Sequence, residues 1–368
     1  MAGRIVVFGA TGYTGRLTAE ALGARGQRAA LAGRDAARLA ELAAELGGGH
    51  DIAVADVGEP ATVRSLVGPG DVLVSTVGPF AKWGDAAAEA AIGGGAHYID
   101  SAGEPPFIRR VFEHHGPAAV RAEVGMLTAF GYDWVPGNLA GALALRDAGD
   151  AAVRVDTGYF ITGSAGAGSM SGGTRASLIG AVGAPSFAWR GGALRTERAA
   201  ARVRTFGVRG RDRAAISAGS SEHFALPRLH PGLLEVNTYL GWFGPLSRAM
   251  PAASLAGSAV LGVPGVRALY RVAADRLVKG STGGPGEAQR AGSGSHIVGI
   301  AYDGAGRELS EVHLSGVDAY TFTGRILAWG AERAAAGALK GTGALGPVDG
   351  FGLDALEAGC AEAGIARA

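Results

Sequence analysis

The stretch VVFGATGYTGRLTAEAL, residues 6–22, decides the fold expected for this chain. An apolar run rich in β-branched residues enters a turn that carries Gly9, Gly12 and Gly15, and helix-forming residues follow. Glycines there allow a tight turn, close approach of the backbone to a pyrophosphate, and close packing of the helix on the strand. The helix amino terminus would offer N–H groups to the phosphates. We therefore predict a strand, a dinucleotide-binding loop and a helix.

The alternation of strand and helix patterns continues through the first third of the chain. Apolar strand patterns recur at 28–34, 51–57, 71–78 and 97–103, and helical patterns lie between them at 36–46, 59–67 and 84–93. Strands that alternate with helices at this spacing predict βαβ units with right-handed crossovers. The expected fold class is therefore α/β, beginning with a Rossmann-type, doubly wound parallel sheet over residues 1–130.

Composition limits the classes of function. At 368 residues the chain exceeds the usual size of one core, so we expect two domains. A net charge of +1 gives no reason to expect nucleic acid or an anionic membrane as a partner. The single cysteine, Cys360, excludes a disulfide framework and is expected to be a buried apolar residue. The first strand begins almost at the N-terminus, which leaves no room for a signal peptide and fits the cytoplasm.

The end of the second expected strand indicates the cofactor. An acidic residue there would bind both ribose hydroxyls and repel a 2′-phosphate. This chain has Arg34, whose guanidinium can hold that phosphate through charge-assisted hydrogen bonds. Asp35 follows and is expected to cap the next helix. We predict NADP(H), although in an arginine-rich chain Arg34 could also be an ordinary surface residue.

Ligands of doubly wound sheets lie beyond the carboxyl ends of the strands. The candidate cofactor-binding residues all lie at those ends, and they are Gly9, Thr11, Gly12, Tyr13, Thr14, Gly15, Arg34, Asp56, Val77, Gly78, Pro79, Phe80 and Ser101. Asp56 is expected at the adenine rim, and the stretch from Gly78 to Phe80 on the nicotinamide side.

Six motifs together resemble the saccharopine dehydrogenase-like oxidoreductases, which include the mycobacterial trans-acting enoyl reductases. The motifs are residues 6–22, STVGPFAKWG at 75–84, HYIDSAGE at 97–104, GYDWVPGNLAG at 131–141, MSGGTRAS at 170–177 and GALGPVDGFGLDAL at 343–356. The resemblance implies NADP(H) as the cofactor, a homodimer, and a last helix that returns to the first domain. Residues from about 180 to 320 add little to it.

The second half of the chain loses the βα rhythm. Alternating patterns at 152–162 and 294–324 predict strands of a mainly antiparallel sheet, with a hairpin turn at 303–306. Helical patterns follow at 325–340 and 353–363. We therefore expect an α+β substrate and dimerisation domain over residues 131–340, and a C-terminal segment, 341–368, that packs on the first domain.

Two compositional features stand out in this half. Residues 187–213 contain eight arginines, which could bind an anionic substrate or form a solvated or dimer surface. Residues 249–266 carry no charge, but Pro251 and Pro264 leave too short an uninterrupted stretch for a membrane helix. We expect this segment to line an apolar substrate tunnel or to be core.

Catalytic residues are fewer than in a hydrolase, because a nicotinamide cofactor would itself carry the hydride. The candidate proton donors are Asp133 and Tyr132, with Tyr98 and Lys82 as weaker candidates. Asp133 could instead cap the helix that begins near Pro136. No histidine pair has metal-ligand geometry, and we expect no metal site.

Three functions fit this sequence. The first is an NADPH-dependent reductase of a conjugated C=C bond in an acyl, polyketide or related metabolite, which is a small-molecule or carrier-bound substrate. The second is an oxidoreductase acting on a C–N bond, by imine reduction or by formation or cleavage of a secondary amine. The third is a non-catalytic NADP-binding sensor or scaffold.

Overall fold

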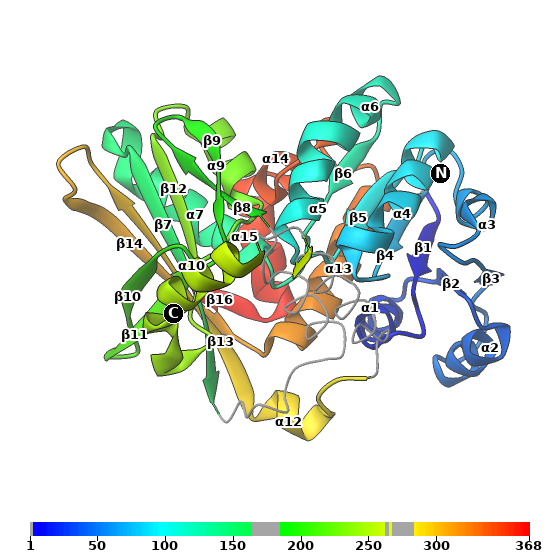
Figure 1. The fold of residues 1–368 in the computed structure, drawn as a ribbon. Helices are drawn as coiled ribbons and strands as arrows, with labels where there is room; N and C mark the ends of the chain where they lie inside the picture. The colour runs from blue at the N-terminus through cyan, green and yellow to red at the C-terminus, as the bar shows by residue number, and fades with distance from the viewer. Residues whose placement is uncertain (1–2, 164–184, 262–264, 267–282) are drawn as a thin grey trace.

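The structure is a computed structural model that describes residues 3–163, 185–261, 265–266 and 283–368 (Figure 1). The motif at 170–177 therefore lies outside the described residues, as do parts of the uncharged stretch 249–266.

The first sheet is parallel and has seven strands, as the βα rhythm predicts. The strand that precedes the glycine turn is central, and its neighbours on both sides run parallel to it. In spatial order the strands are β15 (Gly343–Ala344), β6 (Gly125–Leu127), β5 (His97–Asp100), β4 (Val72–Ser75), β1 (Ile5–Phe8), β2 (Ala29–Gly33) and β3 (Ile52–Val54). Because β1 and β4 carry only buried residues, helices must cover both faces of the sheet.

The connecting helices are α1 (Tyr13–Ala24), α2 (Ala36–Glu45), α3 (Pro60–Arg64), α4 (Phe80–Gly94), α5 (Pro105–Arg110), the π-helical turn η1 (Val111–His115) and α6 (Gly116–Arg121). The starts of α2 and α3 lie within one residue of the predicted positions, α4 begins four residues earlier than predicted, and α5, η1 and α6 have no counterpart among the predictions. Asp35 is the N-cap of α2, as predicted, and its Oδ1 accepts from the backbone N–H groups of Ala37 (3.0 Å) and Arg38 (3.1 Å).

The second sheet has nine strands and is mostly antiparallel. Its main path runs through β10 (Val203–Val208), β11 (Arg211–Ser217), β12 (Glu235–Leu240), β7 (Arg154–Gly163), β13 (Ser293–Tyr302), β14 (Glu308–Gly316) and β16 (Ile365–Arg367), and β8 (Pro185–Arg190) pairs with both β12 and β9 (Ala193–Arg198). The predicted hairpin turn at 303–306 joins β13 to β14. The pairing of β12 with β7 is parallel.

The strand pattern predicted up to residue 324 extends too far. Asp318 ends it, because its Oδ1 accepts from the N–H groups of Tyr320 (2.9 Å) and Thr321 (3.1 Å) and so caps helix α13 (Ala319–Ala335). Although its range falls in the expected second domain, α13 packs along α1 and over the first sheet. A Cβ on Gly324 would lie 2.9 Å from Leu17, so a glycine permits this close helix contact.

The central helix α7 (Val135–Ala148) lies between the two sheets, and Val135 to Leu145 are all buried. It packs on β7, β13 and β14 and is covered by the helices α9 (Glu222–Leu229), α14 (Pro347–Phe351) and α15 (Leu353–Ala363). Cys360 on α15 is fully buried, as expected. The C-terminal segment contributes one strand to each sheet, because β15 pairs with β6 in the first sheet and β16 pairs with β14 in the second. The remaining short elements are η2 (Gly149–Ala151), η3 (Gly244–Arg248), α10 (Met250–Leu261) and α12 (Glu287–Ala291).

The described part of the uncharged stretch is mainly helix α10, and it is not core. The side chains of Leu255 and Val260 are 60% and 57% exposed. Within the described residues, no helix is long and apolar enough to cross a membrane.

Candidate functional site

The glycine turn after β1 has the geometry that a dinucleotide loop requires. Gly9 has a φ of +89°, where a side chain would be strained. A Cβ on Gly15 would lie 2.2 Å from the Gly9 carbonyl oxygen, so only glycine lets α1 approach the strand this closely. Gly12 is the N-cap of α1 and provides no side-chain cap. The first-turn N–H groups of α1 therefore point out of the helix without a side chain that satisfies them.

Arg34 and Asp56 lie together where β2 and β3 end. Arg34 Nε is 4.0 Å from Asp56 Oδ2, and the Arg34 side chain is 76% exposed. The distance is too long for a hydrogen bond, so the guanidinium can turn toward a phosphate. Thr11 lies at the same edge, 3.8 Å from the position that a Cβ on Gly33 would take.

Tyr13 points away from the glycine turn and toward the second half of the chain. Its hydroxyl donates to the Pro285 carbonyl (2.5 Å) and accepts from Arg290 (3.0 Å), and its ring meets the Tyr320 ring edge to face. This cofactor candidate therefore joins the turn to α12 and α13.

The segment from Val77 to Phe80 leads from β4 into α4, as the nicotinamide-side assignment requires. The helix begins on a carboxylate that the sequence alone does not indicate, because Glu104 accepts from the N–H groups of Phe80 (2.8 Å) and Ala81 (2.6 Å). Glu104 is 6% exposed and follows the end of β5, close to the candidate Ser101. No local pattern could reveal this cap, because the capped helix begins 24 residues earlier in the chain.

Asp133 lies at the same edge of the first sheet, at the junction with the second. Its Oδ2 is 3.2 Å from the position that a Cβ on Gly103 would take, and its buried Oδ1 has no hydrogen-bond partner among the described residues. Loss of hydration raises the pKa of Asp133 to about 7. The alternative role as a helix cap is wrong, because α7 has Trp134 as its N-cap and no side-chain cap. A carboxyl that titrates near neutrality can hold and release a proton.

The other candidate donors are less suited to proton transfer. Burial raises the pKa of Tyr132 and of Tyr98 above their ordinary value of 10.0. The Tyr132 hydroxyl lies 3.5 Å from the Phe160 carbonyl oxygen, inside the second domain. Lys82 is exposed on α4, with its Nζ 4.9 Å from the centre of the Trp83 ring.

A buried polar cluster behind Asp133 was not predicted. The Tyr159 hydroxyl lies 2.7 Å from Glu222 Oε1, 3.0 Å from the Trp134 carbonyl oxygen and 2.8 Å from the Gly137 nitrogen. Asn138 donates through Nδ2 to the same Trp134 carbonyl (2.9 Å). These residues come from α7, β7 and α9, so no local pattern could join them.

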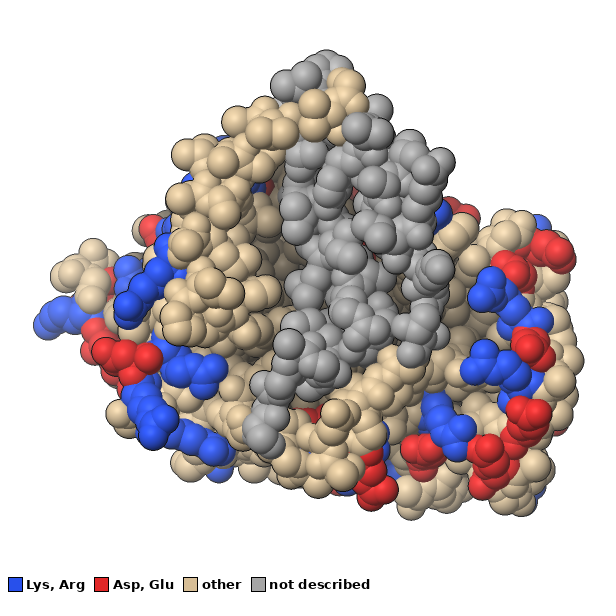
Figure 2. Space-filling view, turned by 60° about the horizontal axis from the view of Figure 1, so that its bottom comes forward, with Lys and Arg blue, Asp and Glu red and all other residues tan. Residues whose placement is uncertain are grey.

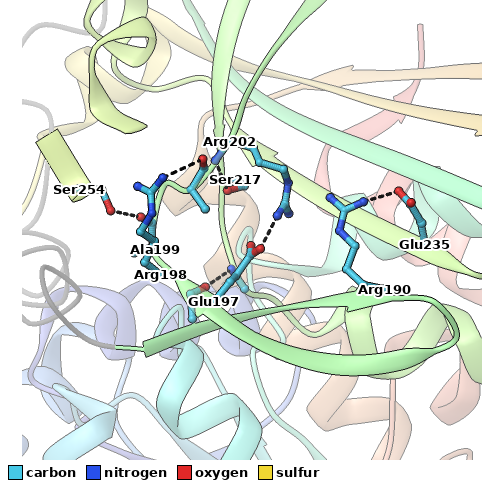
Figure 3. A network of polar contacts seen from close by, with 11 residues as sticks. Arg190, Glu197, Arg198, Ala199, Arg202, Ser217, Glu235 and Ser254 are labelled. Carbon is cyan, nitrogen blue, oxygen red and sulfur yellow. Dashed lines mark hydrogen bonds and ion pairs between the residues drawn. The ribbon is translucent and has the colours of Figure 1, made fainter. Parts of the chain in front are cut away.

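Five of the eight clustered arginines contact other parts of the fold, and Figure 3 shows Arg190, Arg198 and Arg202 among them. Arg190 pairs with Glu235 and Arg202 with Glu197. Arg198 donates to the Pro251 carbonyl (2.6 Å) and so ties β9 to α10. Figure 2 shows basic side chains gathered over the second sheet on this face, whereas basic and acidic ones mix over the first. These pairings favour a structural role for these arginines over substrate binding. No cluster of metal-ligating side chains occurs in the described ranges.

Residues 5–124 match the family described as "Saccharopine dehydrogenase NADP binding domain". A trans-acting enoyl reductase of Mycobacterium leprae is 37% identical over 140 residues, which are 37% of this chain and 34% of that protein. A trans-acting enoyl reductase of Mycobacterium tuberculosis is 34% identical over 140 residues, which are again 37% of this chain and 34% of that protein. The matched region thus spans about a third of the length of these relatives. The matches confirm the resemblance predicted from the motifs and NADP(H) as the expected cofactor.

Two solved structures share the fold over nearly the whole chain. Saccharopine dehydrogenase (L-Glu forming) from Saccharomyces cerevisiae superimposes with a TM-score of 0.60 at 14% identity, covering 97% of this chain and 96% of that one. Homospermidine synthase from Legionella pneumophila gives 0.63 at 10% identity, covering 100% and 92%. At these identities the likeness concerns the fold alone, and it confirms the predicted fold class.

Proposed function

We propose that this chain, whose residues 5–124 form a saccharopine dehydrogenase-type NADP-binding domain, is an NADPH-dependent reductase of conjugated C=C bonds in acyl or polyketide substrates. The observation that carries the proposal is the Asp133 carboxyl, which titrates near neutrality and has an unpartnered Oδ1 beside the nicotinamide-side strand ends. The enoyl reductase relatives support this choice of bond.

The first domain would hold the cofactor by its phosphates. The N–H groups at the start of α1 would hold the pyrophosphate, and Gly9 and Gly15 let the turn and α1 pack closely enough on the strand to present them. Arg34 would bind the 2′-phosphate, because its exposed guanidinium has no hydrogen bond to Asp56 and can turn toward the phosphate. Bound NADPH supplies the hydride.

Reduction of an enoyl group adds a hydride to the β-carbon and a proton to the α-carbon. Protonated Asp133 gives up that proton and is left as a carboxylate, which takes a new proton from solvent before the next turnover. Trp134 Nε1 is buried and also lacks a partner among the described residues, so it is a donor available to the substrate carbonyl. We propose a small-molecule or carrier-bound substrate. We also propose that the protein is a cytoplasmic homodimer.

The test follows NADPH absorbance with enoyl thioesters, with cyclic imines, and with pairs of an amino acid and a keto acid. We expect turnover with the thioesters and a loss of at least a hundredfold in kcat for Asp133→Asn. Turnover only with imines or amino acid pairs would instead establish the C–N oxidoreductase. NADPH binding without turnover in all three groups would indicate a sensor or scaffold.

The role of Arg34 is tested separately by cofactor affinity. We expect Arg34→Asp to weaken NADPH binding by roughly tenfold to a hundredfold, because a charge-assisted phosphate contact is lost, and to leave NADH binding nearly unchanged. The control Arg64→Asp makes the same charge change at an exposed position on α3 and should leave both affinities alone. Equal losses of both cofactors with Arg34→Asp would show that this residue does not bind the 2′-phosphate.

A further inference from the structure

The three contacts of the Tyr159 hydroxyl can all be hydrogen bonds when the Glu222 carboxyl is protonated. The Tyr159 oxygen accepts from the Gly137 N–H, at 2.8 Å. Its single hydrogen has two oxygen neighbours, the Trp134 carbonyl at 3.0 Å and Glu222 Oε1 at 2.7 Å, and Tyr159 can donate it to only one of them. When Tyr159 donates to the Trp134 carbonyl, the contact with Glu222 is a hydrogen bond only if Glu222 supplies the hydrogen. A protonated Glu222 satisfies every contact of this hydroxyl at once.

The contact between Tyr159 and Glu222 leaves no room for a side chain at Gly137. A Cβ on Gly137 would lie 2.0 Å from the Tyr159 hydroxyl oxygen and 2.5 Å from Glu222 Oε1. Glycine at this position of α7 therefore allows β7 and α9 to bring the two groups onto the helix start. Glu222 is fully buried at the first position of α9, where water does not hydrate a charge.

We propose that Glu222 is a positioning residue: it keeps its proton at neutral pH and, through the Tyr159 hydroxyl, holds the backbone turn from Trp134 to Gly137 on which Asp133 stands. The inference deepens the proposed function and rests on it for the role of Asp133. An ionised Glu222 would free the Tyr159 hydrogen from the Trp134 carbonyl and put a second negative charge near Asp133. The turn would then loosen, and the proton of Asp133 would be harder to release.

The surroundings of Glu222 favour its neutral form. Burial raises the pKa of Glu222 to about 8, although hydrogen bonds with Tyr159, Ser220 and its own backbone lower it, and the charge of Asp133 acts in the same direction as burial. His223 does not neutralise a carboxylate here, because burial lowers its pKa to about 3. The elements packed around Glu222 carry several titratable and charged groups. They are Asp133 just before α7, Arg146 and Asp147 on α7, Arg154, Asp156 and Tyr159 on β7, Glu235 and Tyr239 on β12, His223 and Arg228 on α9, and Asp349 on α14. Arg228 donates to the Ala344 carbonyl oxygen (2.7 Å), and its guanidinium lies 3.9 Å from Asp349 Oδ2.

The first experiment needs no substrate. Infrared spectra of the whole protein should show a protonated carboxylic acid at pH 7 that disappears with a pKa near 8 and is missing in Glu222→Gln. Asp133→Asn removes the buried acid whose pKa is raised to about 7 and should leave the component that titrates near 8 in place. Amide exchange at Gly137 should be at least tenfold faster in Tyr159→Phe and Glu222→Leu than in the wild type, and unchanged within twofold in Glu222→Gln, whose amide can still donate to Tyr159. A wild-type band that titrates in the ordinary carboxyl range, or equal exchange in all variants, would overturn the proposal.

The second experiment uses the enoyl thioester assay. Wild-type kcat should fall in two steps, one near pH 7 as Asp133 loses its proton and one near pH 8 as Glu222 ionises. Glu222→Gln should keep most of its kcat at pH 7 and lose only the second step. Glu222→Leu should lose at least tenfold in kcat at pH 7 with NADPH affinity unchanged, which shows that the first domain is folded. Glutamine and leucine variants with equal losses would refute positioning by a hydrogen-bond donor. If no thioester is turned over, the proposed function fails, while the infrared and exchange results still decide the state and contacts of Glu222.

Discussion

Replacement of Glu222 by glutamine should change how the stability of the protein depends on pH. In the native state Glu222 has a pKa of about 8, against 4.5 for an ordinary glutamate. Between these values the native protein holds one proton more than the unfolded chain. A raised acid pKa therefore contributes stability that is fully present below pH 4.5 and is lost as pH rises toward 8.

The size of the effect follows from that single proton. One proton of difference changes the free energy of unfolding by about 1.4 kcal/mol per pH unit. Between pH 5.5 and 7.5, the wild type should therefore lose about 3 kcal/mol relative to Glu222→Gln, which cannot release a proton there. Above about pH 8 the difference between the two proteins should become constant.

Urea unfolding at closely spaced pH values, followed by both tryptophan fluorescence and circular dichroism, measures this difference. Asp133→Asn is the companion variant, because the pKa of Asp133 is raised only to about 7 and its effect should end about one pH unit lower. If the stability curves of the wild type and Glu222→Gln run parallel from pH 5.5 to 7.5, then Glu222 is ionised in the native protein and the hydrogen-bond argument is wrong.

Three further substitutions test the packing around the site. Gly15→Ala should weaken NADPH binding more than tenfold in a fluorescence titration, because its Cβ would lie 2.2 Å from the Gly9 carbonyl oxygen, and retained affinity would contradict the loop geometry. Glu104→Ala should lower the free energy of unfolding by about 1–3 kcal/mol, since the N–H groups at the start of α4 lose their partner, and Glu104→Gln should recover part of it. Gly137→Ala should destabilise the protein by about 2–4 kcal/mol, whereas the control Gly23→Ala in α1, with nothing within 4 Å, should be neutral or stabilising by up to about 1 kcal/mol. Equal effects of the last two would show that Gly137 is not closely packed.

Local sequence patterns were sufficient for much of the fold. The glycine turn and its flanking strand and helix, the cap at Asp35, the hairpin turn at 303–306 and the last helix at 353–363 all lie where they were predicted. Each depends on residues within a few positions of one another. Periodicity, capping and turn chemistry act over that distance, so one sequence reveals them. Periodicity alone is not sufficient at Asp318. It predicts a strand up to residue 324, but Asp318 caps a helix and ends the strand pattern earlier.

Short patterns in chain order are enough to predict the parallel sheet, the dinucleotide loop and NADP(H) as the cofactor. The groups that surround Asp133 come together only through packing in three dimensions. Glu104 caps a helix that begins 24 residues before it, and Glu222 meets Tyr159 across 63 residues of chain. Burial then gives these carboxyl groups their chemistry, since it removes the water that would keep Asp133 and Glu222 charged. Neither the pairing nor the dehydration has a signature in the neighbouring residues, so both arise when α7, β7 and α9 pack together.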